Sequence, residues 1–233
     1  MKIDILTLFP EMFAPMKESI LKRATESGLL EINVINIRDY SKDKHKKCDD
    51  YTFGGGPGML MMPQPIYDAM TSIEGYERAL KIYMSPKGAT FTQKKSRFIA
   101  MNYEHLIILC GHYEGVDQRI IDMLIDEEIS IGDYVLTGGE IPAMVVVDAV
   151  ARHIDGVLHS FESTEVESFE NNLLEYPQYT KPREFMGMEV PEVLLSGDTA
   201  ELQSGEDNKL NKSQKNADLI CTMKTMKKMI IKK

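Results

Sequence analysis

Tryptophan is absent from the 233-residue sequence, and cysteine occurs only three times. Cys48, Cys110 and Cys221 stand alone, without the paired spacing of zinc ligands or of a disulfide framework, which favours a reducing compartment. Long apolar runs are also missing, and none reaches the roughly 20 residues that cross a bilayer. The first apolar stretch contains Asp4 and lacks a small-residue cleavage site. We therefore expect a cytoplasmic protein with no signal peptide and no membrane partner.

Two phosphate-binding patterns can be tested against the sequence. The pattern G-x-x-x-x-G-K-[ST] does not occur, which excludes a P-loop. Residues 54–58 formally satisfy G-x-G-x-G, but the segment before them, "HKKCDDYTF", is polar and charged where a dinucleotide site needs a hydrophobic strand. The glycines therefore predict either a tight surface turn or a loop that leaves flat space for a planar group.

Charge is distributed unevenly along a chain whose net charge is −9. Residues 155–207 carry 13 acidic side chains and two basic ones, whereas residues 209–233 carry eight lysines and one aspartate. A second basic segment, "RDYSKDKHKK", spans residues 38–47. Either basic segment is a solvated face or a contact surface for nucleic acid, and taken alone each pattern favours the solvated face.

Alternating apolar residues and helical spacing predict an α/β fold with a mainly parallel sheet. Apolar residues recur at helical spacing between residues 12 and 24, with Gly28 as a C-cap, and again over 141–154. The loops 85–88, 111–115 and 136–140 each occupy the kind of place, outside the carboxyl end of a strand, where such sheets bind ligands. The predicted strands are 3–8, 32–37, 81–84 and 105–110.

A change in composition divides the chain after about residue 155. We predict a first domain over residues 1–160, an acidic linker over 161–186, and a small, lysine-rich helical domain over 187–233.

Six segments together carry a resemblance to a known family, and they occur in order from residue 8 to residue 198. They are "LFPEMF" (8–13), "DDYTFGGGPGMLM" (49–61), "YMSPKG" (83–88), "CGHYEGVDQR" (110–119), "SIGDYVLTGGEIPAM" (130–144) and "GMEVPEVLLSGD" (187–198). The sequence resembles the bacterial tRNA (guanine-N1)-methyltransferases, the TrmD family of the SPOUT superfamily.

The resemblance implies an α/β domain with a deep trefoil knot, followed by a small helical domain that contacts tRNA. It implies methyl transfer from S-adenosylmethionine to N1 of the guanosine at tRNA position 37, 3′ of the anticodon. The implied partners are the tRNA anticodon stem-loop and a second copy of the chain, which completes a composite active site. A requirement for Mg²⁺ is left open, and no residues are assigned as metal ligands.

The resemblance also assigns cofactor-binding residues to three loops. Backbone groups at close range suit the flat, weakly polar adenine, and the carboxylate of Glu114 suits the positive amino and sulfonium groups. The first loop supplies Tyr83, Met84, Ser85 and Pro86, the second supplies Gly111, Glu114 and Gly115, and the third supplies Ile131, Gly132, Asp133, Tyr134, Val135, Leu136, Gly138, Gly139 and Pro142.

The reaction needs a base for the N1 proton of guanine and a cation or donor where negative charge builds on O6. The resemblance assigns these roles to Glu167 and Arg152, although the family has aspartate at the position of Glu167. The extra methylene displaces the carboxylate, and about 1 Å of misplacement can cost about a hundredfold in rate.

The resemblance also implies RNA-binding residues, against which a flipped-out base would lie. They are Asp50, Gly54, Gly55, Gly56, Pro57, Gly58 and Met59.

Further departures from the family pattern keep two alternatives open. His112 replaces an arginine, Glu175 an aspartate and Lys181 an arginine, and residues 200–220 retain little of the family's tRNA-binding element. The protein is therefore expected to be a tRNA methyltransferase. The alternatives are a diverged homologue that binds cofactor and RNA without methylating, and an enzyme that methylates another RNA.

Overall fold

The computed structural model describes residues 1–158 and 177–195. The chain divides into two compact units, residues 1–159 and 160–233. Most of the predicted linker, and all of the predicted helical domain except residues 187–195, lie outside the described residues.

The first unit is built on a parallel sheet of five strands in the order β2-β1-β6-β5-β7. The predicted α/β class with a mainly parallel sheet is therefore confirmed. Ile107, Ile108 and Leu109 in the central strand β6 are fully buried, as in parallel sheets that are covered on both faces. The strands are β1 (Lys2–Thr7), β2 (Glu31–Asn36), β5 (Leu80–Thr90), β6 (His105–Cys110) and β7 (Glu127–Ser130).

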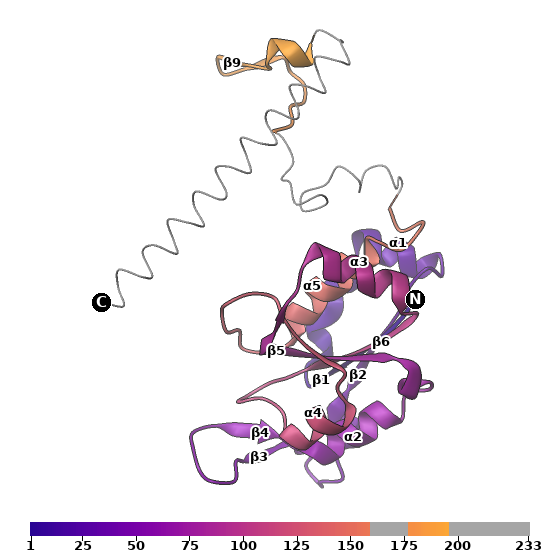
Figure 1. The fold of residues 1–233 in the computed structure, drawn as a ribbon, viewed down its shortest axis with the longest axis vertical. Coiled ribbons are helices and arrows are strands. Elements are labelled where there is room, and N and C mark those ends of the chain that lie inside the picture. The colour runs from indigo at the N-terminus through magenta and orange to yellow at the C-terminus, as the bar shows by residue number, and fades with distance from the viewer. Residues whose placement is uncertain (159–176, 196–233) are drawn as a thin grey trace, which may run out of the picture. The chain divides into compact units, whose positions relative to one another are not determined.

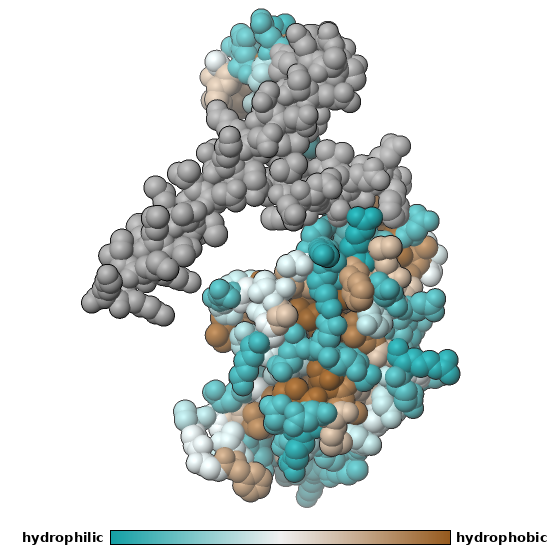
Figure 2. Space-filling view, in the orientation of Figure 1, coloured by the Kyte–Doolittle hydropathy of each residue, from teal (hydrophilic) through white to brown (hydrophobic). Residues whose placement is uncertain are grey.

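Helices cover both faces of this sheet (Figure 1). Alternation along β1 sends Ile3 and Ile5 into one core cluster and Leu6 into the other. On the face shown in Figure 2, apolar surface gathers in the band between the two helical layers. One layer contains α1 (Ser19–Glu26), α3 (Gln93–Asn102) and α5 (Glu140–Ala151), and the other contains α2 (Pro63–Thr71) and α4 (Gln118–Leu124).

The first predicted helix is in fact two helices of different type. A 3-10 helix, η1 (Pro10–Lys17), precedes α1, and the chain between them is extended at Glu18. Pro15 lies inside η1 and lacks the N–H group that an α-helix would use there. Gly28 follows α1 with φ +74°, in the left-handed conformation expected after a helix.

An antiparallel hairpin carries the glycine-rich segment. Its strands are β3 (Asp49–Tyr51) and β4 (Met59–Met61), and residues 52–58 form the connecting loop. Because a hairpin, and not a strand followed directly by a helix, surrounds these glycines, the G-x-G-x-G match is not a dinucleotide fingerprint. Two further 3-10 helices, η2 (Ile37–Tyr40) and η3 (Tyr76–Arg78), complete the first unit.

In the second unit, the described residues 177–195 form a short hairpin and one 3-10 turn. These are β8 (Glu184–Phe185), β9 (Met188–Glu189) and η4 (Glu192–Leu194). Across the described parts of both units, no helix has the length and apolar character needed to cross a membrane.

Candidate active site

A cavity of about 510 Å³ lies where the parallel strands β5, β6 and β7 end. Three loops line it: residues 85–88 within β5, residues 111–115 after β6, and residues 131–139 between β7 and α5. The pairing of β5 with β7 shifts register between Met84 and Ala89, so the first loop bulges out of the sheet. The cavity therefore occupies the edge of the sheet where ligands bind in this fold class.

The structure brings nearly all of the predicted cofactor residues to this one cavity. Asp133 alone among them does not line it. The lining residues from the prediction are Tyr83, Met84, Ser85, Pro86, Gly111, Glu114, Gly115, Ile131, Gly132, Tyr134, Val135, Leu136, Gly138, Gly139 and Pro142.

The second and third loops touch through their backbones. The amide of Gly139 donates a 2.8 Å hydrogen bond to the carbonyl of Gly111, and Gly138 forms an isolated antiparallel bridge with His112. A Cβ atom on Gly139 would lie 2.8 Å from the Cα atom of Cys110 and 2.8 Å from the amide nitrogen of Gly111. Backbone atoms cannot yield as a flexible side chain does, so position 139 excludes every side chain.

The hairpin loop lies beside the cavity without lining it. Gly54, Gly55, Gly56 and Gly58 all have positive φ, between +80° and +128°. A Cβ atom on Gly54 or Gly55 would meet nothing within 4 Å, whereas one on Gly58 would overlap the side chain of Glu114. The first three glycines therefore serve the turn, and Gly58 leaves room for a carboxylate that lines the cavity.

Hydrogen bonds fix the hairpin to the second loop. The amide of Glu114 donates to the carbonyl of Met59 at 3.0 Å, and the amide of Met61 donates to the carbonyl of Gly115 at 2.9 Å. Asp50 in β3 accepts from the backbone amide of Tyr51, which lowers the pKa of its carboxyl group together with Lys47. The hairpin and its predicted RNA-binding residues thus have a defined position next to Glu114.

Two ionisable groups near the cavity stay protonated at neutral pH. Burial, reinforced by the negative charge of Glu128, raises the pKa of Tyr83 to about 12. Burial also raises the pKa of the Cys110 thiol well above its usual value, with a further contribution from Glu140. Because a raised pKa favours the neutral acid, Tyr83 can donate a hydrogen bond but cannot act as a base, and Cys110 is not a nucleophile.

The two predicted catalytic residues are not part of the cavity lining in the described chain. Arg152 is half-buried at the C-cap of α5, while Gly139 and Pro142 at the start of that helix line the cavity. The 12 residues of α5 separate its two ends by about 18 Å. Glu167 lies outside the described residues, so its role stays a prediction.

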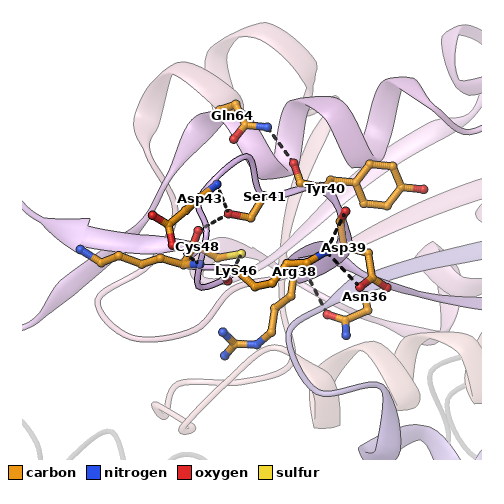
Figure 3. Close-up of polar contacts among 10 residues, drawn as sticks. Asn36, Arg38, Asp39, Tyr40, Ser41, Asp43, Lys46, Cys48 and Gln64 are labelled. Atoms are coloured by element: carbon orange, nitrogen blue, oxygen red, sulfur yellow. Dashed lines mark hydrogen bonds and ion pairs between the residues drawn. The ribbon is translucent and has the colours of Figure 1, made fainter.

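The basic segment 38–47 folds back on itself (Figure 3), and three of its five Lys and Arg side chains pair with carboxylates. Lys42 pairs with Asp68 at 2.9 Å, and Lys46 and Lys47 pair with Asp39 and Asp50. The amide of Asp43 donates to the hydroxyl of Ser41, and Asn36 caps η2 through Arg38 (Figure 3). These contacts favour the solvated-face interpretation of this segment.

Sequence reasoning missed several residues of the cavity lining. Most lie inside the quoted family motifs and could have been included on that ground, but Ile121, Glu128 and Ile129 lie outside those motifs, and no sequence signal pointed to them. No group of three or more His, Cys, Asp or Glu side chains within the described ranges could hold a metal ion. The additional lining residues are Leu60, Lys87, His112, Tyr113, Val116, Gln118, Ile121, Glu128, Ile129, Ser130 and Thr137.

Comparison with known proteins agrees with this arrangement. The model of the family described as tRNA (Guanine-1)-methyltransferase TrmD matches residues 1–222. The chain belongs to the TrmD family. The match covers all three cavity loops, the hairpin and the position of Glu167.

Curated relatives extend the similarity over most of the chain. Proteins named tRNA (guanine-N(1)-)-methyltransferase from Ruminiclostridium cellulolyticum, Clostridioides difficile and Staphylococcus carnosus are 60%, 55% and 52% identical to it. These alignments cover 87%, 84% and 88% of this chain, and 88%, 87% and 83% of the three relatives. The TrmD resemblance is thereby confirmed.

Gly55 and Gly58 form a matched pair for testing the contact with Glu114. Their φ angles are +80° and +85°, so alanine costs similar backbone strain, about 1 kcal/mol, at either position. Only Gly58→Ala should displace the Glu114 side chain, which would appear as shifted NMR signals of Glu114 and Gly115. Equal, small shifts in both variants would contradict the close approach of Gly58 to Glu114.

Proposed function

We propose that the protein is a tRNA (guanine-N1)-methyltransferase that transfers the methyl group of S-adenosylmethionine to N1 of guanosine 37. The observation that carries this proposal is the identity of 52–61% to curated proteins of that name over most of the chain. The cavity formed by the three family loops supports it independently, because the aligned residues meet at one place.

The cavity fits a nucleoside cofactor in size and chemistry. Its volume of about 510 Å³ is within the range of small-molecule sites, about 300–1,000 Å³. Gly111 and Gly139 line the cavity and offer it only peptide groups, and a Cβ atom would press on Tyr83 at position 111 and on backbone at position 139. Glu114 offers a carboxylate to the cationic end of the ligand. S-adenosylmethionine supplies an electrophilic methyl group when it is bound there.

The chain's own residues must remove one proton and stabilise developing charge. Guanine N1 carries a proton at neutral pH, so a base has to accept it as the methyl group arrives. We assign the base to the Glu167 carboxylate and the stabilisation of O6 to the Arg152 guanidinium. We do not assign the base to Tyr83, because a phenol is protonated at neutral pH and burial raises the pKa of Tyr83 further, to about 12.

A second copy of the chain is part of the proposal. Arg152 lies a helix length away from the cavity of its own chain, so a site composed from two chains would explain its role. Ile141 and Val145, one turn apart on α5, are 47% and 44% exposed although both are aliphatic. Exposed apolar side chains beside the cavity suit a closed two-fold interface.

A trefoil knot is the topology we infer for the first unit. Residues 130–139 lead from β7 at the edge of the sheet to α5, whose buried side chains pack against the central part of the sheet. On the way they bond to the end of β6. The family relationship supports a threaded crossing at this point.

We also assign the anticodon stem-loop to the hairpin side of the cavity, and we place the protein in the cytoplasm.

The proposed reaction predicts a strict choice of base. Transcripts of tRNA with guanosine at position 37 should accept a labelled methyl group, and the same transcripts with adenosine there should not, because only guanine offers the N1–H and O6 pair. Mass spectrometry of the product locates the methyl group. Cofactor binding without transfer to any RNA would favour a diverged homologue that binds without methylating, and transfer only to another RNA would favour an enzyme with a different RNA substrate.

The catalytic assignment predicts the effect of two substitutions. Glu167→Gln and Arg152→Ala should each lower turnover about a hundredfold or more, while affinity for S-adenosylmethionine changes little. Single-turnover kinetics and calorimetry separate the two quantities. Glu167→Asp should raise turnover if glutamate is a misfit, and lower it if the site has adjusted. Normal turnover of Glu167→Gln would show that this carboxylate is not the base.

The dimer proposal predicts the mass in solution. Light scattering at micromolar concentration should give about twice the chain mass of 26.4 kDa. Val145→Asp should give monomers, because it would bury an unpaired charge in the interface, whereas Met101→Asp on α3 should stay dimeric. A parent protein that is monomeric at every concentration would rule out the composite site.

A further inference from the structure

We propose that Thr7 and Glu140 are positioning residues that hold the second and third cavity loops together. The inference rests on the proposed function, because its consequence is the affinity of that cavity for S-adenosylmethionine. Neither residue belongs to the cavity lining, and neither is part of the catalytic assignment.

The bond between them is buried and joins distant parts of the chain. The Thr7 hydroxyl donates a 2.8 Å hydrogen bond to Oε1 of Glu140, across 133 residues of sequence. Thr7 is 0% exposed and Glu140 is 1% exposed. The same hydroxyl oxygen accepts a 2.9 Å hydrogen bond from the amide of Phe9. Because a hydroxyl has one proton, these two bonds fix its orientation toward the carboxylate.

The carboxylate in turn limits the position of the third loop. A Cβ atom on Gly138 would overlap Oε2 of Glu140 and lie 2.8 Å from Nδ1 of His112. Gly138 is also the residue that forms the backbone bridge with His112 in the second loop. The backbone of the third loop therefore passes between the Glu140 carboxylate and the His112 ring, where nothing larger than glycine fits.

The ring of His112 completes the enclosure from the other side. It packs on the ring of Phe9 with the centroids 4.8 Å apart, and Phe9 is the residue whose amide bonds to Thr7. Within the described structure, Nδ1 of His112 is buried without a hydrogen-bond partner. The contacts thus form a closed ring of residues. Phe9 bonds to Thr7 and Thr7 to Glu140, Gly138 lies between Glu140 and His112, and the His112 ring packs on Phe9.

Burying a carboxylate at this place requires compensation. An ionised group taken out of water is costly unless hydrogen bonds and favourable dipoles replace its hydration. Glu140 has the Thr7 hydroxyl, and it occupies the first turn of α5, where the helix dipole favours negative charge. An apolar side chain would fill the same volume at lower cost, so a carboxylate here indicates that orientation is needed as well as packing.

Asp4 provides a matched control for a purely structural role. It is a buried carboxylate on the same strand, 2% exposed, bonded to His105 at 2.6 Å and to Asn33 at 3.0 Å. It lies in the amino-terminal half of β1 and bonds to His105, the first residue of β6, whereas the cavity lies at the carboxyl ends of the strands. Asp4→Asn should therefore lower stability without loosening the cavity loops.

The test compares Thr7→Val, Thr7→Ser, Glu140→Gln and Asp4→Asn in the full chain. Hydrogen exchange of the Gly139 amide, measured relative to the Ile108 amide in the core, reports the bond between the two loops without any cofactor. Calorimetry with S-adenosylmethionine reports affinity. Thr7→Val keeps the shape of the side chain but removes the donor, so it should weaken affinity about tenfold and speed Gly139 exchange by a similar factor. Thr7→Ser, which keeps the hydroxyl, should restore both.

The outcomes distinguish this inference from the proposed function. Glu140→Gln keeps an acceptor for Thr7 but loses the charge, so its effect should be smaller than that of Thr7→Val. If Thr7→Val changes Gly139 exchange and affinity no more than Asp4→Asn does, the positioning role is wrong. If the parent protein fails to bind S-adenosylmethionine, the proposed function fails, and relative exchange at Gly139 still decides whether Thr7 holds the loops.

Discussion

Contact between two backbones is the constraint on which the candidate site depends. The hydrogen bond from Gly139 to Gly111 brings the start of α5 against the end of β6. A Cβ atom at position 139 would press on the backbone of Cys110 and Gly111. The cavity exists because the third loop passes so close to the second. The first loop can bulge toward them only because β5 shifts its register against β7.

The buried carboxylate of Glu140 follows from the same constraint. Backbones in close contact have little side-chain surface with which to hold one another, so their approach must be fixed from outside. Thr7 and Glu140 do this from the end of β1 and the start of α5, two elements that the core already fixes. Rigid elements therefore position loops that consist largely of peptide groups, which suits a site that reads a flat ligand.

Different parts of the structure could be predicted to different degrees. Strands β1, β2 and β6 are nearly continuous apolar or alternating runs, so their existence and type followed from the pattern. Strand β7 was missed because Glu127 and Glu128 interrupt its short apolar part. The cavity loops were located as segments that follow strand ends, and the family motifs assigned cofactor residues to them, but no periodicity predicts that loops so far apart meet. Thr7 gave no signal, and Glu140 was assigned no role although it lies in the motif at residues 130–144, because their bond joins residues 133 apart.

The glycines of the hairpin loop show how backbone geometry and function can require the same residue. At Gly56, φ is +128°, a value that side chains other than glycine rarely adopt, whereas Gly54 and Gly55 have values that asparagine also tolerates. Packing within the protein does not exclude side chains at Gly54 and Gly55, because an added Cβ atom at either position would meet nothing within 4 Å. Under the proposed function, the open space at Gly54 and Gly55 is where a flipped guanine would approach, and side chains at these positions would then obstruct the base while leaving the packing of the free protein unchanged.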